Sequence, residues 1–283
     1  KLSDYIRIHL GKMNDIQKKV LLFISSIHYY TGMEIPMVIL QHIIEKEGGK
    51  KLEQILSKKQ SSLLLVSGEG VRTLHHCVSG ELLKQLCSDG MINEKAWKNN
   101  LEVTLMSVID VFELFQENIK IMRILKALFL NQQPSNKNID DIEQKHFSYA
   151  IEDLPSDIAK KKILVKLCEK IKKNPYVYSN LARYYHYIEN NEDSALEYLQ
   201  HALEITEDYT FYHLKGIILA KKMRTYIEKN VNEINEDYQA FVRKLNDGLE
   251  EVEESYDKSV ELNVENIAAF TSKLNYLLSI IRD

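Results

Sequence analysis

Two apolar series of helical spacing lie between Asn174 and Leu203, and they constrain the fold more than any other feature of the chain. The first series is Tyr178, Leu181, Ala182 and Tyr185, and the second is Ala195, Leu199, Ala202 and Leu203. Steps of three and four residues place each series on one side of an α-helix. The small side chains of Ala182 and Ala202 allow two helices to approach closely, while aromatic rings fill the groove between them. The spacing therefore predicts an antiparallel pair of helices.

Less regular series of the same kind flank this pair. A weaker unit is predicted from Phe147 to Ile171, and the later ones are marked by Phe211, Tyr212, Leu214, Gly216, Tyr256, Ser259, Val260 and Leu262. A terminal helix from Ile267 to Ile281 closes the stack. These patterns are typical of tetratricopeptide repeats, although the turn from Glu189 to Asp193 is one residue longer than usual. We expect an irregular tetratricopeptide-like helical array over residues 141–283.

An acidic stretch interrupts the array between Tyr226 and Leu262. It holds four basic and eleven acidic residues, a local charge of −7. Its apolar residues follow a helical stripe, which consists of Val231, Ile234, Tyr238, Phe241, Leu245, Leu249, Val252 and Tyr256. The stripe fits two arrangements: long helices that pack on the repeat stack, or a protruding hairpin that meets another chain. We predict an insertion of long helices around residues 226–255, with a break near Gly248.

The first third of the chain changes from helical to alternating spacing. Helices are predicted from Asn14 or Asp15 to Tyr29, from Pro36 to Ile44, and from Leu52 onward. Strands are predicted over residues 62–67 and 71–78, with Gly68-Glu69-Gly70 as their turn and Ser79 as the cap of the next helix. Three helices followed by a two-stranded wing form the winged-helix pattern, which we assign to residues 1–92. A helical linker block over residues 93–140 follows it.

The fold class predicted from these patterns is mainly α, with an N-terminal winged-helix domain followed by the irregular tetratricopeptide-like array. Ten glycines and four prolines are few for 283 residues. Such sparse punctuation favours long helices over a many-stranded sandwich or barrel.

The predicted second strand and the helix pair carry a family resemblance. The strand reads Val71-Arg72-Thr73-Leu74-His75-His76-Cys77-Val78 and is similar to the Met-His-Asp motif of STAND-type signalling ATPases. Leu74 takes the Met place, His75 the His place, and His76 departs from the Asp. The segment NPYVYSNLARYYHYIENNEDSALEYLQHAL resembles the tetratricopeptide region of the interferon-induced sterile-alpha-motif antiviral proteins. Bacterial anti-phage STAND proteins look similar in layout.

The resemblance implies a winged helix that follows an ATPase core, and a role for the whole protein in innate antiviral or anti-phage defence. It implies that His75 donates to the β-phosphate of a bound ADP in the full-length protein. The alternative is that His75 lies at the edge of a strand and has only a structural role, with its hydrogen bonds made within the domain. If His75 lies on a strand, it shares a face with Cys77 while His76 faces the other way, and a zinc site needs about four convergent ligands. We therefore expect no metal.

The sequence predicts no catalysis by this segment. Gly11-Lys12-Met13 and Gly49-Lys50-Lys51 lack the upstream Gly and the following Ser or Thr of a phosphate-binding loop. We expect no cofactor here, and any ATPase core to lie upstream of Lys1. Three cysteines without a CxxC motif are typical of reduced thiols, so we expect a cytoplasmic protein. No apolar run is long enough to cross a bilayer.

Charge and aromatic residues indicate candidate interaction surfaces. Residues 1–90 carry a charge of +3 and the rest −7, so a globally basic nucleic-acid coat is excluded. Lys50, Lys51, Lys58 and Lys59 cluster on the predicted third helix, as a nucleic-acid contact or a solvated helix face. Six tyrosines crowd into the helix pair: Tyr176, Tyr178, Tyr184, Tyr185, Tyr187 and Tyr198. A helix pair cannot bury all six. We predict that Tyr184 or Tyr187, with Arg183 and His186, lines a partner-binding surface; the alternative is packing around Phe147 and Tyr212.

The function predicted from the sequence is a non-catalytic regulatory and protein-interaction region, a scaffold or sensor, of a STAND-like ATPase. Its expected partners are proteins: the upstream ATPase core, other subunits or a trigger protein. No membrane is expected as a partner. A nucleic acid is a possible partner but not the expected one. Two alternatives of different class remain: a free-standing tetratricopeptide adaptor that binds peptides, and a winged-helix DNA-binding regulator with a sensing repeat domain.

Overall fold

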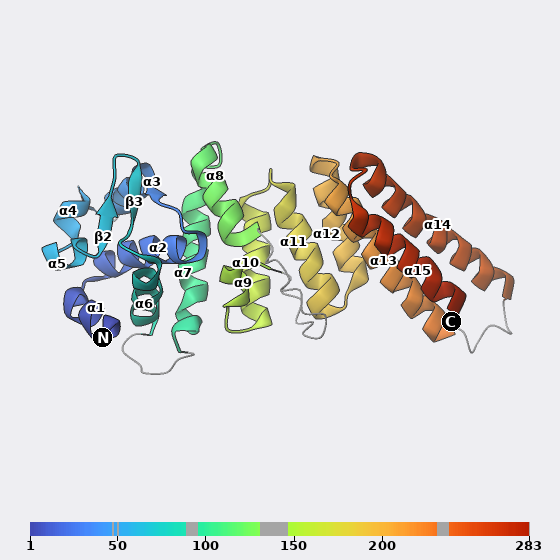
Figure 1. The fold of residues 1–283 in the computed structure, drawn as a ribbon, viewed down its shortest axis with the longest axis horizontal. Helices are drawn as coiled ribbons and strands as arrows, with labels where there is room; N and C mark the ends of the chain where they lie inside the picture. The colour runs from blue at the N-terminus through green and yellow to red at the C-terminus, as the bar shows by residue number, and fades with distance from the viewer. Residues whose placement is uncertain (47, 50, 89–95, 131–146, 231–237, 283) are drawn as a thin grey trace. The chain divides into compact units, whose positions relative to one another are not determined.

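The computed structural model describes residues 1–46, 48–49, 51–88, 96–130, 147–230 and 238–282 of the chain. Across these residues the protein is mainly helical, which confirms the predicted fold class at that level (Figure 1). The chain divides into two compact units, residues 1–171 and 172–283. The boundaries predicted near residues 92 and 140 fall outside the described residues. The segment from Phe147 to Ile171, predicted as a weak repeat, belongs to the first compact unit.

Six helices and three strands make up the first half of unit 1. They are α1 (Leu2–Leu10), α2 (Asp15–Thr31), β1 (Ile35–Pro36), α3 (Met37–Lys46), α4 (Leu52–Ile55), α5 (Lys58–Ser61), β2 (Leu64–Val66), β3 (Gly70–Thr73) and α6 (His76–Cys87). Helix α2 begins where its cap predicts: Asn14 Oδ1 accepts from the Gln17 amide at 2.9 Å, and Gln17 Oε1 accepts from the Asn14 amide at 3.1 Å. These two bonds satisfy donors that the first turn leaves unpaired.

The strands form a small antiparallel sheet in the order β1-β3-β2 (Figure 1). Val71 of β3 pairs with Ile35 of β1 on one side and with Val66 of β2 on the other. The predicted hairpin of two strands is confirmed, with Ser67 donating its amide to the Gly70 carbonyl at 2.9 Å across the turn. Strand β1 was not predicted, because a strand of two residues is too short to show a period.

The strand predicted over residues 71–78 is wrong beyond Thr73. His75 instead caps helix α6, with its Nδ1 accepting from the Cys77 amide at 3.2 Å. The imidazole thus replaces the Ser or Asp side chain that usually caps a helix. Ser79, predicted as the cap, lies buried inside α6. His75 and Cys77 therefore do not share the face of a strand.

The rest of unit 1 is helical, with α7 (Ala96–Glu113), α8 (Ile119–Leu125), the π-helical turn η1 (Lys126–Leu130), α9 (Tyr149–Glu152) and α10 (Asp157–Lys170). The predicted helical linker block is interrupted where Asn118 caps α8. Phe23 of α2 meets Phe112 of α7 edge to face, with ring centroids 6.3 Å apart. Both rings are buried, so α2 is the central helix of this core.

Unit 2 is a sequence of packed helices, coloured from yellow to red in Figure 1. They are α11 (Pro175–Tyr184), the π-helical turn η2 (Tyr185–Glu189), α12 (Glu192–Ile205), α13 (Tyr209–Asn230), α14 (Tyr238–Leu262) and α15 (Ile267–Arg282). Each helix packs on the next in the chain. Ala182 and Ala202 are fully buried in the core beside Phe211. The helix pair predicted from the alanines is confirmed.

The extra residue predicted between α11 and α12 is accommodated by a change of helix type. The turn η2 has π-helical hydrogen bonding, which holds one more residue per turn than an α-helix. Asn190 then ends it in the left-handed conformation, with φ at 51°. Asparagine tolerates this conformation better than most residues.

The described part of the acidic stretch comprises the end of α13 and the whole of α14, and these two helices pack together. Tyr226 of α13 stacks on Phe241 of α14 with ring centroids 5.7 Å apart. Val252 and Tyr256 of the predicted stripe are buried in the core of unit 2, so this part of the stripe packs within the unit rather than against another chain. The predicted break is wrong, since Gly248 lies inside α14, where the end of the Met223 side chain packs against it. Two members of the stripe, Val231 and Ile234, lie outside the described residues.

Candidate functional site

The predicted phosphate contact His75 lies exposed at the start of α6, beside His76 and Cys77, which are also exposed. His76 stacks on the Tyr29 ring at 4.8 Å, and its Nε2 lies 2.9 Å from the Tyr29 carbonyl oxygen. The two histidines are therefore engaged in local contacts of α6 with α2 and with the first turn of α6. In the part of the chain that the structure describes, no group of three His, Cys, Asp or Glu side chains converges as a metal site requires.

The predicted basic cluster lies on two short helices rather than one. Lys51 precedes α4, and Lys58 and Lys59 begin α5; all three are exposed. Lys50 lies outside the described residues. Ser57 divides the two helices, because its hydroxyl accepts from the Gln60 amide and starts a new helix. Each helix has four residues, little more than one turn, so neither presents a long face to a DNA groove.

The predicted tyrosine surface is wrong for two of its residues. Tyr184 and His186 are each only 3% exposed. The imidazole Nδ1 of His186 lies 3.4 Å from a carboxylate oxygen of Glu192, so this side chain points into the protein. Tyr187 and Arg183 are partly buried and keep an exposed portion. Their role in partner binding stays a prediction.

The other tyrosines of this pair have local roles. Tyr185 of η2 and Tyr198 of α12 stack almost in parallel, with ring centroids 5.3 Å apart. Tyr176 donates from its hydroxyl to Asp208 Oδ2 at 2.6 Å. This hydrogen bond, with burial as the lesser cause, raises the pKa of Tyr176 to about 12. These three tyrosines thus take part in packing and helix-end contacts.

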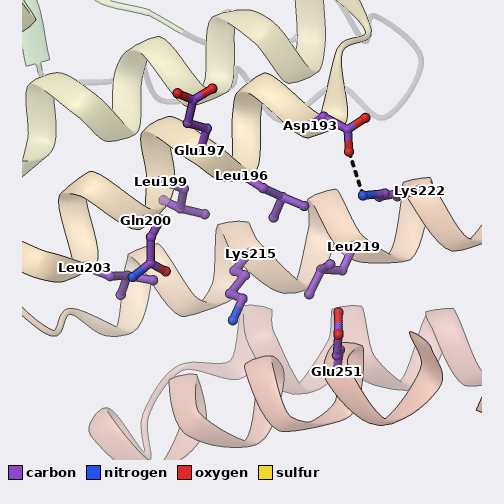
Figure 2. Close-up of a pocket in the computed structure, with 10 residues that line it drawn as sticks. All are labelled: Asp193, Leu196, Glu197, Leu199, Gln200, Leu203, Lys215, Leu219, Lys222 and Glu251. Carbon is purple, nitrogen blue, oxygen red and sulfur yellow. Dashed lines mark hydrogen bonds and ion pairs between the residues drawn. The ribbon is translucent and has the colours of Figure 1, made fainter. Parts of the chain in front are cut away.

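A groove lies along α12, α13 and α14 within unit 2 (Figure 2). It has a volume of about 440 Å³ and is lined by Asp193, Leu196, Glu197, Leu199, Gln200, Leu203, Lys215, Leu219, Lys222 and Glu251. The leucines form an apolar floor, and two of them, Leu199 and Leu219, are also part of the buried core. The floor is therefore held in place by the packing of the unit itself.

Charged side chains surround this floor. At one end Lys222 binds Asp193 with an Nζ–Oδ1 distance of 2.6 Å. Figure 2 shows Lys215 extending from α13 toward α14, and Glu251 extending from α14 toward α13. Within the described residues, the Lys215 ammonium and the Glu251 carboxylate have no ion pair. Both groups are therefore available to a ligand.

A second hollow continues the groove beyond the Lys222–Asp193 pair. It has a volume of about 520 Å³ and is lined by Asn190, Asn191, Glu192, Asp193, Lys222, Thr225, Tyr226, Lys229 and Asn230. The two hollows share Asp193 and Lys222 and so adjoin along the seam of α12 and α13; together they are here called the elongated groove. No spacing in the sequence indicates this groove, since its lining residues come from separate helices that only tertiary packing brings together.

A cluster of aromatic and cationic side chains joins α11, α13, α14 and α15. It consists of Arg183, Tyr187, His213, Tyr256 and Ser272, here called the Arg183 cluster. His213 Nε2 lies 3.1 Å from Ser272 Oγ, and the His213 ring lies 6.0 Å from the Tyr256 ring. Burial lowers the pKa of His213, and the charge of Arg183 lowers it further. Burial also lowers the pKa of Arg183.

Comparison with family models, curated proteins and solved structures found no match to this chain. Among the described residues, no helix combines the length and apolar character that a membrane span requires.

Proposed function

We propose that this chain is the non-catalytic regulatory and protein-interaction region of a STAND-like ATPase that acts in antiviral or anti-phage defence. The observation that carries the proposal is the elongated groove of unit 2, with a leucine floor and unpaired charges at its edge. Such a surface suits a peptide segment that has both apolar and charged side chains. The Lys215 and Glu251 charges would select the segment, and the leucines would supply most of the buried area.

The order of elements in unit 1 supports the winged-helix part of the proposal. Helix α2 is followed by β1, then by α3 to α5, and then by the hairpin of β2 and β3, with β3 in the middle of the sheet. This is the order of a winged helix. In unit 2, consecutive antiparallel helices with alanines at their seam support a tetratricopeptide-like array.

The proposed mechanism couples the two units to an ATPase core. The winged helix holds the core in its ADP-bound state, with His75 as the contact to the phosphate. A partner that fills the groove favours the active state only if it binds that state more tightly than the inactive one. Cytoplasmic localisation follows from this role and is part of the proposal.

The first test is the coding sequence upstream of Lys1, where the proposal requires Walker A and Walker B motifs. In the full-length protein, deletion of residues 1–171 is expected to release bound ADP. The groove variant Lys215→Glu is expected to retain ADP but to lose the defence response in cells, because the partner no longer docks. Arg243→Glu, an exposed charge reversal on α14 outside the groove, is the matched control. A start codon directly before the codon of Lys1, or ADP retention by the protein that lacks residues 1–171, would overturn the proposal.

One observation favours a second candidate, a DNA-binding regulator. Lys51, Lys58 and Lys59 are all exposed beside the small sheet of unit 1. A gel-shift assay at physiological salt distinguishes the two functions. Specific binding to one duplex at nanomolar concentration, lost in the Lys58→Ala/Lys59→Ala variant, would support this candidate. Weak binding that is abolished by salt would instead indicate a solvated basic surface without specific DNA recognition.

A further inference from the structure

Arg183 is a cation held inside unit 2 without a counter-charge. Its Nε is buried and has no hydrogen-bond partner among the described residues. Among the described residues no carboxylate acts on it: burial lowers its pKa, and Tyr187 alone of the described groups opposes that effect. Burying a guanidinium without an anion or a full set of hydrogen bonds is costly. We therefore expect this arginine to have a function, such as binding an anion.

The surroundings of Arg183 are suited to an anion. Tyr187 and His213 are its charged or titratable neighbours. Ser272 adds a hydroxyl 3.1 Å from His213 Nε2. Arg183 as a whole is only partly buried, so the end of its side chain reaches an accessible surface. Donors from α11, η2, α13 and α15 thus gather around one uncompensated positive charge.

We propose that the Arg183 cluster is a binding site for a carboxylate group of a partner protein. A guanidinium binds a planar carboxylate through two parallel N–H···O bonds. A single cation balances a carboxylate of charge −1, whereas a phosphate dianion needs a second cation, and burial disfavours the charged form of His213. The inference rests on the proposed function for its protein partner, and it adds the chemistry that the partner must carry.

Binding at this site is coupled to proton uptake. A carboxylate beside His213 offsets the charge of Arg183 and so raises the pKa of the imidazole. The groups that face His213 are Arg183 from α11, Tyr256 from α14 and Ser272 from α15, and none of them is an acid. Affinity for the carboxylate therefore increases as the pH falls from about 8 to about 6.

The test uses the whole 283-residue chain and two simple anions. The chain is titrated with glutarate, and separately with inorganic phosphate, in chloride buffer of constant ionic strength. The imidazole resonances of His213, assigned with the His213→Gln variant, report binding by NMR. We expect a saturable shift with glutarate, weaker binding of phosphate, and tighter glutarate binding at the lower pH. Arg183→Met should weaken glutarate binding by roughly tenfold or more.

Controls separate a binding role from a structural one. Arg243→Met removes an exposed guanidinium of α14 and should leave glutarate binding unchanged. In chloride buffer alone, Arg183→Met should melt no lower than the native chain, because it removes an unpaired buried charge. A melting temperature lowered as much as by a core truncation would assign Arg183 a structural role and overturn the proposal.

Three further outcomes decide the matter. Absence of a saturable shift with either anion would overturn the site, and phosphate binding tighter than glutarate would overturn the carboxylate assignment. The groove variant Lys215→Glu tests the proposed function independently, because it lies outside the Arg183 cluster and should leave the glutarate titration unchanged. Loss of the defence response in that variant, with no glutarate binding in the native chain, would leave the proposed function standing and remove only this site.

Discussion

The imidazole Nδ1 of His28 lies 2.7 Å from the hydroxyl oxygen of Ser79, although 51 residues separate them in the chain. Thr73 completes the contact, with its Oγ1 2.6 Å from the same Nδ1 and 2.6 Å from Ser79 Oγ. All three side chains are buried. This polar triad therefore joins α2, β3 and α6 inside the core of unit 1, where each hydrogen bond is stronger than in water.

The triad predicts that acid destabilises unit 1. Burial lowers the pKa of His28, and the positive charges of Arg72, His76 and His75 lower it further, while Glu34 opposes them weakly. The unfolded chain, with its histidine pKa near 6.5, then binds more protons than the folded chain. Stability is fully present above about pH 6.5 and decreases as the pH falls below it toward the lowered pKa.

The measurement is chemical unfolding of the native chain and of His28→Asn across that pH range. Asparagine keeps a polar atom near the position of Nδ1 but does not titrate. At about pH 8 we expect His28→Asn to have a lower free energy of unfolding than the native chain. On acidification, its free energy of unfolding should decrease less than that of the native chain. His213, whose pKa is also lowered, contributes in the same window, so His213→Gln is the comparison variant. An unchanged pH profile in His28→Asn would contradict the prediction.

Gly216 is expected to reject even a methyl group. A Cβ at this position would lie 2.7–2.8 Å from three carbons of the Tyr256 ring, and a buried aromatic ring cannot move aside cheaply. Replacement of a helical glycine by alanine gains about 1 kcal/mol from helix propensity, whereas overpacking costs about 1–3 kcal/mol. The cost of overpacking should exceed the gain in helix propensity, so Gly216→Ala is expected to lower the melting temperature.

Gly248 supplies the matched control on the neighbouring helix. A Cβ there meets only the end of the flexible Met223 side chain, which can adopt another rotamer. Gly248→Ala should therefore leave the melting temperature unchanged or raise it. Equal destabilisation by both substitutions would show that contact with the Tyr256 ring is not the cause of the stability lost in Gly216→Ala.

Local signals explain which parts of the fold the sequence predicts. The start of α2 follows from the Asn14 cap, and the α11–α12 pair follows from Ala182 and Ala202, since short-range spacing specifies both. The first helix was missed because Ile6 and Leu10 are its only buried apolar residues. The end of β3 was misplaced because a histidine, not a serine, caps the next helix.

The candidate sites depend on contacts that spacing does not encode. Arg183 and His213 come from different helices, and only the packing of α11, α13 and α15 brings their neighbours together. Tyr184 and Tyr187 look equivalent in the sequence, yet Tyr184 is buried while Tyr187 keeps an exposed portion. Tyr184 is the last residue of α11, whereas Tyr187 lies inside the π-helical turn η2, whose wider turn changes its angular position.

Asp153 is expected to stabilise unit 1 by connecting three segments. Its Oδ2 accepts from the Tyr30 hydroxyl at 3.0 Å, and its Oδ1 lies 2.9 Å from Lys98 Nζ. Asp153→Asn keeps the shape but removes the charge, and it should cost about 1–2 kcal/mol in denaturant unfolding. Asp110→Asn, at an exposed pair with Lys166, is the control and should leave the unfolding midpoint nearly unchanged. Similar midpoints for both variants would refute the role of Asp153.

The three thiols are predicted to differ sharply in reactivity. Cys77 is exposed in the first turn of α6, whereas Cys87 and Cys168 are buried. Burial raises the pKa of Cys168 to about 12, so almost none of it is thiolate at neutral pH. The thiolate is the reacting form, and a disulfide reagent reaches an exposed sulfur far more readily than a buried one. A disulfide reagent should therefore modify one thiol rapidly in the folded chain and all three in denaturant. Cys77→Ser should abolish the rapid phase and leave the slow one, and a rapid phase that persists in this variant would place the reactive thiol elsewhere.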